Sequence, residues 1–299
     1  MIRPVRFESN PLTADSNRFQ GKSSESPDAQ QAQALKEFDR LVAALRDSGI
    51  EVVVVEDTPT PHTPDSIFPN NWISLHADGR VVLYPMEARN RRTERRIDII
   101  EHLNVELGLL VTEVVDLTKH EDAGRYLEGT GSMVLDRANR VAYACLSSRT
   151  HLDPLGDFAQ RMNYEVVAFD AVDANGVPIY HTNVVMNVGE QLAVICDAAI
   201  QRDDQREAVL AQLRDSGHDV ISLSYEQLEA FAGNMLELRN DQGERVIAMS
   251  QRAFDSLNEE QLDKLRANGK IVSVPIDIIE SSAGGSVRCM LAEVHLQNV

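Results

Sequence analysis

The segment EGTGSMVLDRANRVAYACLSSRTHLDPLGDFAQRMNYEVVAF, residues 128–169, contains one full copy of a pattern that runs through the whole chain. Residues 132–135 and 141–145 are mostly apolar and flank the polar segment 136–140, which predicts a β-hairpin. Leu155, Phe158 and Met162 then recur at helical spacing, and Val166 and Val167 follow. The segment therefore predicts two strands, an amphipathic helix and a buried third strand, in that order.

The same pattern returns along the chain. A helix followed by a strand is predicted at residues 35–55, 153–169, 205–223 and 258–274, with a weaker copy at 92–115. Further hairpins are predicted at residues 72–84, 184–196 and 235–249. The fifth hairpin would use residues 287–296 and borrow residues 5–7 from the N-terminus. Five helix-strand units therefore alternate with five two-strand units.

Polar residues open successive hairpins at an interval of about 50 residues, which is typical of repeat architectures. They are Glu128, His181, Asn234 and Ser286, and the preceding interval from Asp65 is longer. Five repeats that return to their starting edge predict an α/β fold closed into a five-bladed propeller, because closure leaves no exposed strand edges. The alternative is an ordinary α/β sheet in which the periodicity is accidental.

The composition narrows the class of protein. A chain of 299 residues with 43% hydrophobic content is long enough to bury a core, so we expect one domain over residues 1–299. The net charge of −18 disfavours nucleic acid as a partner. We find no signal peptide or membrane-spanning stretch and expect a cytoplasmic protein. Cys145, Cys196 and Cys289 lie far apart, which argues against a disulfide framework or a zinc site.

The chemistry is expected at the polar and glycine-rich openings of the hairpins, which a closed array brings together. Cys289 follows Gly284 and Gly285 and could act as a nucleophile. His181 would transfer protons, and Glu128 would hold the histidine or a substrate NH₂ group. Taken alone, a histidine is more often structural and a cysteine more often fills a core, so both interpretations stay open at this point. Cys145 and Cys196 sit late in apolar strands, which predicts core positions.

These residues resemble the pentein superfamily, which has a fivefold arrangement of αββαβ units and includes arginine deiminases, dimethylarginine hydrolases and amidinotransferases. The resemblance covers the whole chain. It implies that Glu128, in the sequence Leu-Glu-Gly-Thr-Gly, is the catalytic acidic residue, that His181 is the catalytic histidine and that Cys289 is the nucleophile.

The resemblance also implies a set of substrate-binding residues. Asp65 and Phe68 look like the Asp-x-x-Phe segment that contacts substrate in dimethylarginine hydrolases. Arg149, in Ser-Arg-Thr, is similar to an arginine that holds a substrate carboxylate, a task that suits its bidentate geometry. The pair Arg91 and Arg92 is similar to a second basic clamp. We take Arg92 as the candidate, and the alternative that Arg91 faces the site stays open.

Two departures from the arginine deiminase pattern suggest the substrate. Asn183 and Asn71 stand where carboxylates usually clasp a cationic guanidinium. An amide both donates and accepts hydrogen bonds, which suits the neutral ureido group of citrulline. The chain also resembles the citrulline-utilisation hydrolase branch, which opens with an Arg-Pro and an Asn-x-Phe-Gln segment like residues 3–4 and 17–20. Where the family has Gly-Gly-Asp, the chain has Gly-Thr-Gly-Ser, a departure at the part of the site that binds the amino-acid end of the substrate.

We therefore expect a cysteine-dependent hydrolase that converts citrulline to ornithine, carbon dioxide and ammonia. The resemblance implies no metal and no organic cofactor, and a small molecule is the expected partner, with homo-oligomerisation left open. The alternatives are an arginine or agmatine deiminase, a dimethylarginine hydrolase or an amidinotransferase. A ribosome-binding pentein would be non-enzymatic, but it would need neither the triad nor an acidic surface.

Overall fold

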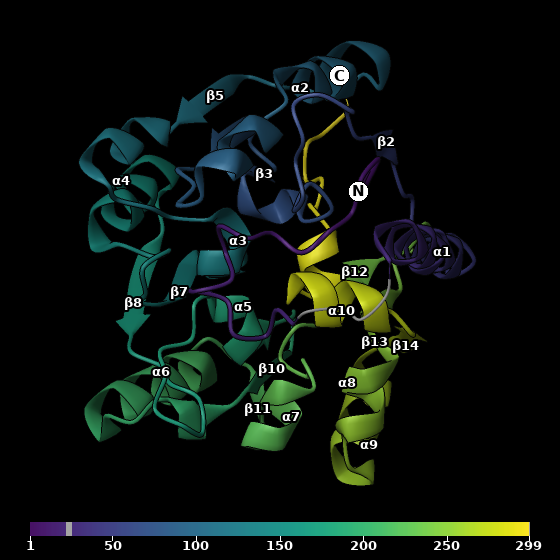
Figure 1. The fold of residues 1–299 in the computed structure, drawn as a ribbon. Helices are drawn as coiled ribbons and strands as arrows, with labels where there is room; N and C mark the ends of the chain where they lie inside the picture. Colours follow the sequence, from purple (N-terminus) through teal and green to yellow (C-terminus); the bar gives the residue numbers. More distant parts are fainter. Residues whose placement is uncertain (22–25, 299) are drawn as a thin grey trace.

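Four small sheets with the same topology repeat through the structure, a computed structural model that describes residues 1–21 and 26–298. In each, two strands form an antiparallel hairpin and a third strand pairs in parallel with the second, as β6, β7 and β8 do. A parallel pair needs a crossover connection, and a helix supplies it in every case. Figure 1 shows the sheets arranged around a common centre.

The four complete units follow one another along the chain. The first comprises η1 (Pro69–Asn71), β3 (Ile73–Leu75), β4 (Arg80–Leu83), η2 (Arg89–Glu94), α2 (Ile97–Glu101), η3 (His102–Glu106), β5 (Glu113–Asp116) and η4 (Thr118–Ala123). The second comprises α3 (Gly129–Ser132), β6 (Val134–Asp136), β7 (Val141–Cys145), α4 (Leu152–Met162) and β8 (Glu165–Phe169). The third comprises α5 (Thr182–Val185), β9 (Met186–Val188), β10 (Leu192–Ile195), η5 (Asp197–Ala199), α6 (Asp203–Asp215) and β11 (Asp219–Ser222). The fourth comprises α7 (Tyr225–Glu229), β12 (Leu236–Arg239), β13 (Arg245–Ser250), α8 (Gln251–Ser256), α9 (Glu259–Asn268) and β14 (Lys270–Val274).

The fifth unit joins the two ends of the chain. It contains α10 (Asp277–Ala283), η6 (Val287–Met290), β1 (Ile2–Arg3), α1 (Pro27–Arg46) and β2 (Val55–Glu56). Its sheet has only two strands, β1 and β2, which pair in parallel. The predicted fifth hairpin is therefore wrong: residues 287–290 form a 3₁₀ turn, and the N-terminal strand is β1 rather than residues 5–7.

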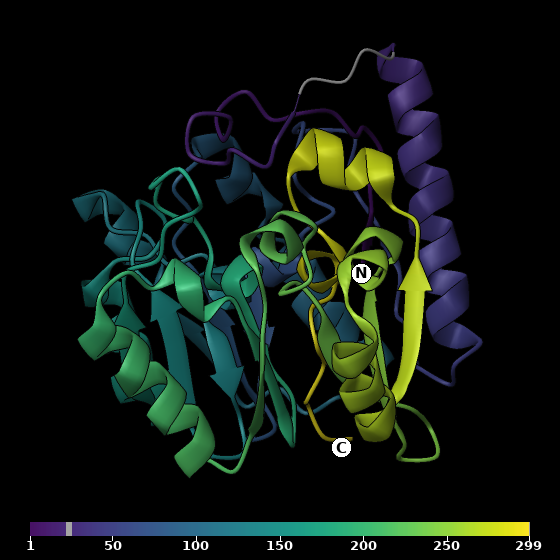
Figure 2. The same ribbon diagram turned by 90° about the horizontal axis from the view of Figure 1, so that it is seen from below.

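Local sequence explains where the long helices begin and what they bury. Ser26 caps α1 by accepting from the Ala29 N–H, and Asn258 with Gln261 forms a capping box at α9. The apolar stripe of α1, which includes Phe38, Leu41 and Leu45, is fully buried. Figure 2 shows α1 lying along β14, and the two elements are in contact.

The core is divided among the units rather than spread over one continuous sheet. The largest apolar cluster links the second, third and fourth units, and it contains both Cys145 and Cys196. Both thiols are fully buried, as expected. Burial raises the pKa of Cys145 to about 12 and that of Cys196 to about 11. The α/β class and the repeated αββαβ unit are confirmed, and separate small sheets replace the single sheet of the alternative interpretation.

Among residues 1–21 and 26–298, none of the helices combines the length and apolar character that crossing a bilayer requires.

Candidate active site

Four short helical turns meet near the common centre of the sheets, and several candidate residues lie in or next to these turns. The turns α3, α5, η1 and η6 are in contact through the pairs α3 with α5, α3 with η1 and η1 with η6. Glu128 immediately precedes α3, His181 immediately precedes α5, and Cys289 lies within η6. Each of these residues belongs to a different repeat unit. The arrangement of the units around one centre therefore brings together side chains that are distant in sequence.

Glu128 and His181 form a buried pair. Glu128 Oε2 lies 2.9 Å from His181 Nε2, and both side chains are almost fully buried. Burial alone raises the pKa of Glu128, but the Arg149 guanidinium, the hydrogen bond with His181 and the charge of Arg91 outweigh it and lower that pKa below its usual range. An ionised carboxylate can only accept, so His181 Nε2 carries the hydrogen in this pair.

The same geometry leaves the other imidazole nitrogen available. Burial lowers the pKa of His181 to about 4, although the contact with Glu128 opposes this shift. The imidazole is therefore neutral at pH 7, and with Nε2 protonated its Nδ1 is an acceptor. A neutral imidazole with a free nitrogen, oriented by a carboxylate, is suited to act as a general base.

Cys289 lies against two side-chain amides. The Nδ2 atoms of Asn183 and Asn234 each lie 3.3 Å from its Sγ. Cys289 lines a small, mostly enclosed pocket together with His181, Asp65, Phe68 and Asn71. Asn183 stands behind Cys289, as Glu128 stands behind His181, so neither of these two residues lines the pocket itself.

Asp65, Phe68 and Asn71 lie on one side of the pocket, at the start of the first unit. Asp65 Oδ2 accepts from Asn10 over 2.6 Å, while its Oδ1 has no partner among the described residues. The ring of Phe68 packs against Gly285, where an added Cβ would lie 2.7 Å from the ring. Only glycine therefore permits this approach of the Cys289 segment to Phe68.

Arg149 is buried and is held by the N-terminal segment. Its Nη2 donates to Ser16 Oγ over 2.7 Å, and its Nη1 donates to Glu128 Oε2 over 3.4 Å. Its guanidinium also lies 4.9 Å from the ring centre of Tyr180. Arg149 thus lines the pocket as expected, while several of its donors already have protein partners.

Arg92 lies away from the pocket, and it differs in this from Glu128 and Asn183, which contact residues that line the pocket. Its Nε donates to the Met86 carbonyl over 3.1 Å and lies 3.3 Å from Glu121 Oε2. Its neighbour Arg91 lines the pocket instead. Arg91 is buried, forms paired hydrogen bonds with Glu94 and donates from Nη1 to Asn71 Oδ1 over 3.0 Å. The position that we assigned to Arg92 is therefore corrected to Arg91.

Sequence reasoning missed several residues of the pocket. Thr13 and Asn17, in the N-terminal segment, line the pocket, and so does Tyr180, which immediately precedes His181. The hydroxyl of Tyr180 donates to the Gly284 carbonyl, and Asn17 Nδ2 also contacts that carbonyl. The nearest sequence signal was the segment 17–20, which we related to a family resemblance and not to the pocket.

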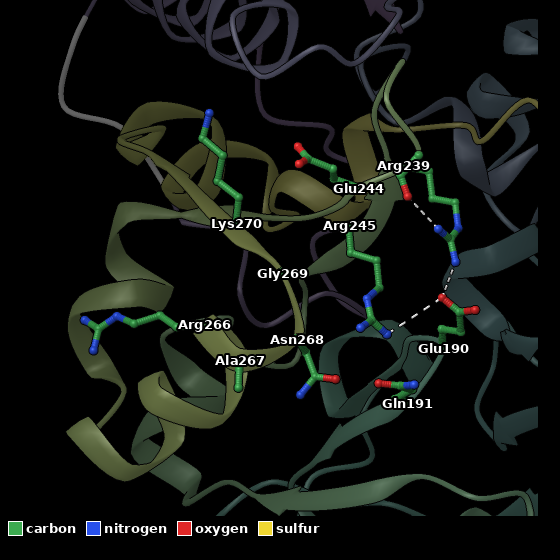
Figure 3. Close-up of a pocket in the computed structure, with 11 residues that line it drawn as sticks. Glu190, Gln191, Arg239, Glu244, Arg245, Arg266, Ala267, Asn268, Gly269 and Lys270 are labelled. Carbon is green, nitrogen blue, oxygen red and sulfur yellow. Dashed lines mark hydrogen bonds and ion pairs between the residues drawn. The ribbon is translucent and has the colours of Figure 1, made fainter.

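A second, more open hollow lies between the third and fourth units, away from these residues. Its lining is mostly charged and polar, and Figure 3 shows Arg239 and Arg245 turned toward Glu190. Both arginines form ion pairs with that carboxylate. This hollow contains none of the residues predicted from sequence. Among residues 1–21 and 26–298, no group of three His, Cys, Asp or Glu side chains has an arrangement suited to a metal ion.

The sequence profile of one protein family matches almost the entire chain. The family is described as N,N dimethylarginine dimethylhydrolase, eukaryotic, and the match extends over residues 3–296. The chain belongs to this family. Membership of the dimethylarginine dimethylhydrolase family confirms the pentein superfamily and the expected enzyme class, a hydrolase that acts on carbon–nitrogen bonds. No curated protein has a significantly similar sequence.

Solved structures share the fold of this dimethylarginine dimethylhydrolase family member at low sequence identity. ArgZ, an arginine dihydrolase from the ornithine-ammonia cycle in cyanobacteria, matches 97% of the chain with a TM-score of 0.74 and 20% identity. The chain spans only 39% of that ArgZ chain, but it spans 95% of the separate N-terminal domain of ArgZ, with a TM-score of 0.73 and 18% identity. A dimethylarginine dimethylaminohydrolase matches with a TM-score of 0.62 and 15% identity over 97% of this chain and 96% of its own.

Proposed function

We propose that the protein hydrolyses citrulline to ornithine, carbon dioxide and ammonia, with Cys289 as nucleophile, His181 as general acid and base, and Glu128 as the carboxylate that orients His181. The observation that carries the substrate assignment is the orientation of the Asn71 amide. Arg91 can only donate, so Asn71 Oδ1 must face Arg91 and Nδ2 must face away from it.

The free ends of the two amides in the site suit a ureido group. Asn71 Nδ2 is a buried donor without a partner among the described residues, and Asn183 Oδ1 is a buried acceptor without one. Buried polar groups are normally paired, so an unpaired donor on a residue that lines the pocket, as Asn71 does, indicates a ligand that pairs with it. The ureido oxygen of citrulline can accept from Asn71, whereas a guanidinium has no acceptor to offer. An NH group of the ureido can donate to Asn183.

In the first half of the reaction, the Cys289 thiolate attacks the ureido carbon and forms a carbon–sulfur bond. The tetrahedral adduct collapses with cleavage of the bond from that carbon to Nδ of the substrate. His181 takes up the proton that the Cys289 thiol has lost and donates it to this nitrogen, so ornithine leaves as a neutral amine. The product on the enzyme is an S-carbamoyl group on Cys289.

In the second half, His181 Nδ1 takes a proton from water as the water oxygen attacks the carbamoyl carbon. The carbon–sulfur bond breaks, the thiolate re-forms, and His181 releases the proton that it took from water. The carbamate that leaves decomposes to ammonia and carbon dioxide. Glu128 keeps the imidazole in one tautomer throughout, and its negative charge stabilises the imidazolium that forms in each half.

Arg149 and Arg91 have different roles in this proposal. Arg149 is the residue that would bind the substrate α-carboxylate, and its contacts with Ser16 would be exchanged for that group. Arg91 is surrounded by Glu94, Asp65 and Glu128, which raise its pKa despite its burial. It therefore stays charged and acts through Asn71, not on the substrate.

The test is a substrate panel with the purified full chain. Citrulline, arginine, agmatine and dimethylarginine are supplied separately, and ornithine, citrulline and ammonia are measured. The proposal expects equal amounts of ornithine and ammonia from citrulline. Turnover of arginine or dimethylarginine without turnover of citrulline would contradict the substrate assignment, although both outcomes fit a hydrolase of carbon–nitrogen bonds.

A second candidate function is hydrolysis of a guanidino substrate such as arginine. Asp65 favours it, because the unpaired Oδ1 of this carboxylate can accept from a guanidinium at the pocket. ArgZ, whose fold is similar, is an arginine dihydrolase. In the same panel, this function predicts release of ammonia from arginine, with citrulline or ornithine as the second product.

A further inference from the structure

The side chain of Asn234 is fixed at the back of the Cys289 sulfur. Asn234 is fully buried and follows Gly233 in the turn between α7 and β12. An added Cβ on Gly233 would lie 2.5 Å from the Val184 carbonyl, so glycine lets this turn approach α5 closely. The turn thereby brings Asn234 beside both Asn183 and Cys289.

The orientation of the Asn234 amide follows from its backbone partners. Oδ1 accepts from the Arg288 N–H over 3.1 Å, and Nδ2 donates to the Asn183 carbonyl over 2.9 Å. A flipped amide would set donor against donor and acceptor against acceptor. The amide nitrogen has two hydrogens, and the second is available for Cys289 Sγ at 3.3 Å.

We infer that Asn234 is a further catalytic residue, which stabilises the Cys289 thiolate by donating a hydrogen bond to its sulfur. This inference rests on the role of Cys289 in the proposed function but not on the identity of the substrate. Asn183 Nδ2 lies at the same distance from the sulfur, so two neutral donors converge on one atom. Hydrogen bonds to an ionised acceptor are about twice as strong as neutral ones, so both donors favour the thiolate over the thiol.

The charge state of His181 explains why these two donors matter for the sulfur. His181 is neutral at pH 7, because burial lowers its pKa to about 4. In the resting site, the imidazole therefore supplies no positive charge that would stabilise a thiolate. When the thiol of Cys289 loses its proton, the amide N–H groups of Asn234 and Asn183 are the donors that stabilise the negative charge on sulfur.

Asn234 differs from Asn183 in one respect that separates their roles. Asn183 Oδ1 has no partner among the described residues, whereas both polar atoms of Asn234 are used within the protein. Neither residue lines the pocket. A substitution at Asn234 should therefore change the reactivity of the thiol and kcat, with little effect on KM.

The experiment measures the rate at which iodoacetamide alkylates Cys289 at pH 7 in the full chain without substrate, with mass spectrometry to locate the label. Asn234→Asp keeps the acceptor for Arg288 but replaces the donor with a negative oxygen. Asn234→Ala removes the donor without adding charge. The matched control is Asn187→Asp on β9, which is buried and has no contact with Cys289.

We expect the alkylation rate to fall by about tenfold or more in Asn234→Asp and by a smaller factor in Asn234→Ala. The ultraviolet absorbance of the thiolate, taken as the difference from Cys289→Ser, should fall in the same order. Circular dichroism melting identifies any variant that fails to fold, and the variant that folds then decides. Unchanged alkylation and thiolate absorbance in a folded Asn234 variant would overturn the inference.

The outcomes also separate this inference from the proposed function. If Asn234 controls alkylation but the wild type does not hydrolyse citrulline, the substrate assignment fails and the role of Asn234 stands. If Cys289→Ser retains full hydrolytic activity, the nucleophile is wrong and the role of Asn234 falls with it.

Discussion

The guanidinium of Arg91 donates to Asn71 Oδ1 over 3.0 Å, and this one contact determines which end of the Asn71 amide remains free for a ligand. The free Nδ2 of Asn71 lies close to Gly131, and so does His181 Nδ1. A Cβ added to Gly131 would lie 2.4 Å from Asn71 Nδ2 and 2.7 Å from His181 Nδ1. A donor and a base thus lie close to each other, and Arg91 orients the donor. Under the proposed function, the substrate preference depends on Arg91 as well as on Asn71.

Replacing Asn71 with aspartate tests this preference. Asn71→Asp keeps an acceptor for Arg91 but removes the donor for a ureido oxygen. We expect kcat/KM for citrulline to fall by about 10- to 100-fold, because loss of a hydrogen bond at a buried polar atom costs about 1–3 kcal/mol. Binding of arginine should improve. Steady-state kinetics on both substrates measure the change, and Asn104→Asp on the exposed surface controls for charge. Unchanged citrulline kinetics in the variant would refute the role of Asn71.

The two adjacent arginines provide a matched comparison. Lysine cannot form the paired hydrogen bonds with Glu94 and the contact with Asn71 together, so Arg91→Lys should lower kcat/KM for citrulline by about tenfold or more. Arg92→Lys should change it by about twofold or less, since Arg92 lies outside the pocket. A larger effect at Arg92 than at Arg91 would restore the assignment made from sequence.

The close approach of Gly131 to the site predicts a steric effect on catalysis. In Gly131→Ala the new methyl group would displace the Asn71 amide or the His181 ring. We expect kcat/KM to fall by about 100-fold or more, because a displacement of about 1 Å can have that effect. Gly156→Ala in α4 is the control, since its added Cβ meets no atom within 4 Å. Equal activity in the two variants would show that the His181 region tolerates the methyl group.

Burial of His181 predicts a pH dependence of stability. Its pKa is about 4 in the folded protein, against 6.5 for a free histidine, so the unfolded chain binds more protons between these pH values. Stability therefore rises with pH across that window and is lost as the pH falls through it. From pH 7 to pH 5, this residue should cost the wild type about 2 kcal/mol of unfolding free energy.

Urea unfolding at pH 7 and pH 5 measures the effect. His181→Gln should lose less stability than the wild type over this interval, whereas His102→Gln, which alters a more exposed histidine, should follow the wild type. Identical losses in the wild type and His181→Gln would mean that the histidine is not held neutral by burial.

Much of the fold follows from local patterns in the sequence. The stripe Leu155, Phe158 and Met162 forms the buried face of α4, and residues 141–145 form β7 as expected. The fifth sheet was not predictable in the same way. Its strands β1 and β2 contain two residues each and pair in parallel, with α1 as the connection. The valine run 52–55 predicted a strand, but only Val55 belongs to β2, and no hairpin or apolar run marks β1.

The site was predictable to the extent that its residues open repeats. Glu128 and His181 occupy equivalent positions before short turns, and the pattern identifies both. Arg91 and Arg92 lie in η2, a 3₁₀ helix in which neighbouring residues face different directions, and nothing local distinguishes them. Thr13 and Asn17 lie in a segment without periodicity, and only its tertiary contacts with Arg149 and Gly284 bring it to the pocket.

The central claim is that Cys289 takes up the ureido carbon of citrulline. Citrulline labelled with ¹³C at that carbon is mixed with the full chain, the reaction is quenched in acid during turnover, and peptides are examined by mass spectrometry. We predict a labelled carbamoyl group on the peptide that contains Cys289, absent from the peptides with Cys145 and Cys196 and absent in Cys289→Ser. Ornithine formation with no label on Cys289 at any quench time, together with full activity of Cys289→Ser, would contradict the account.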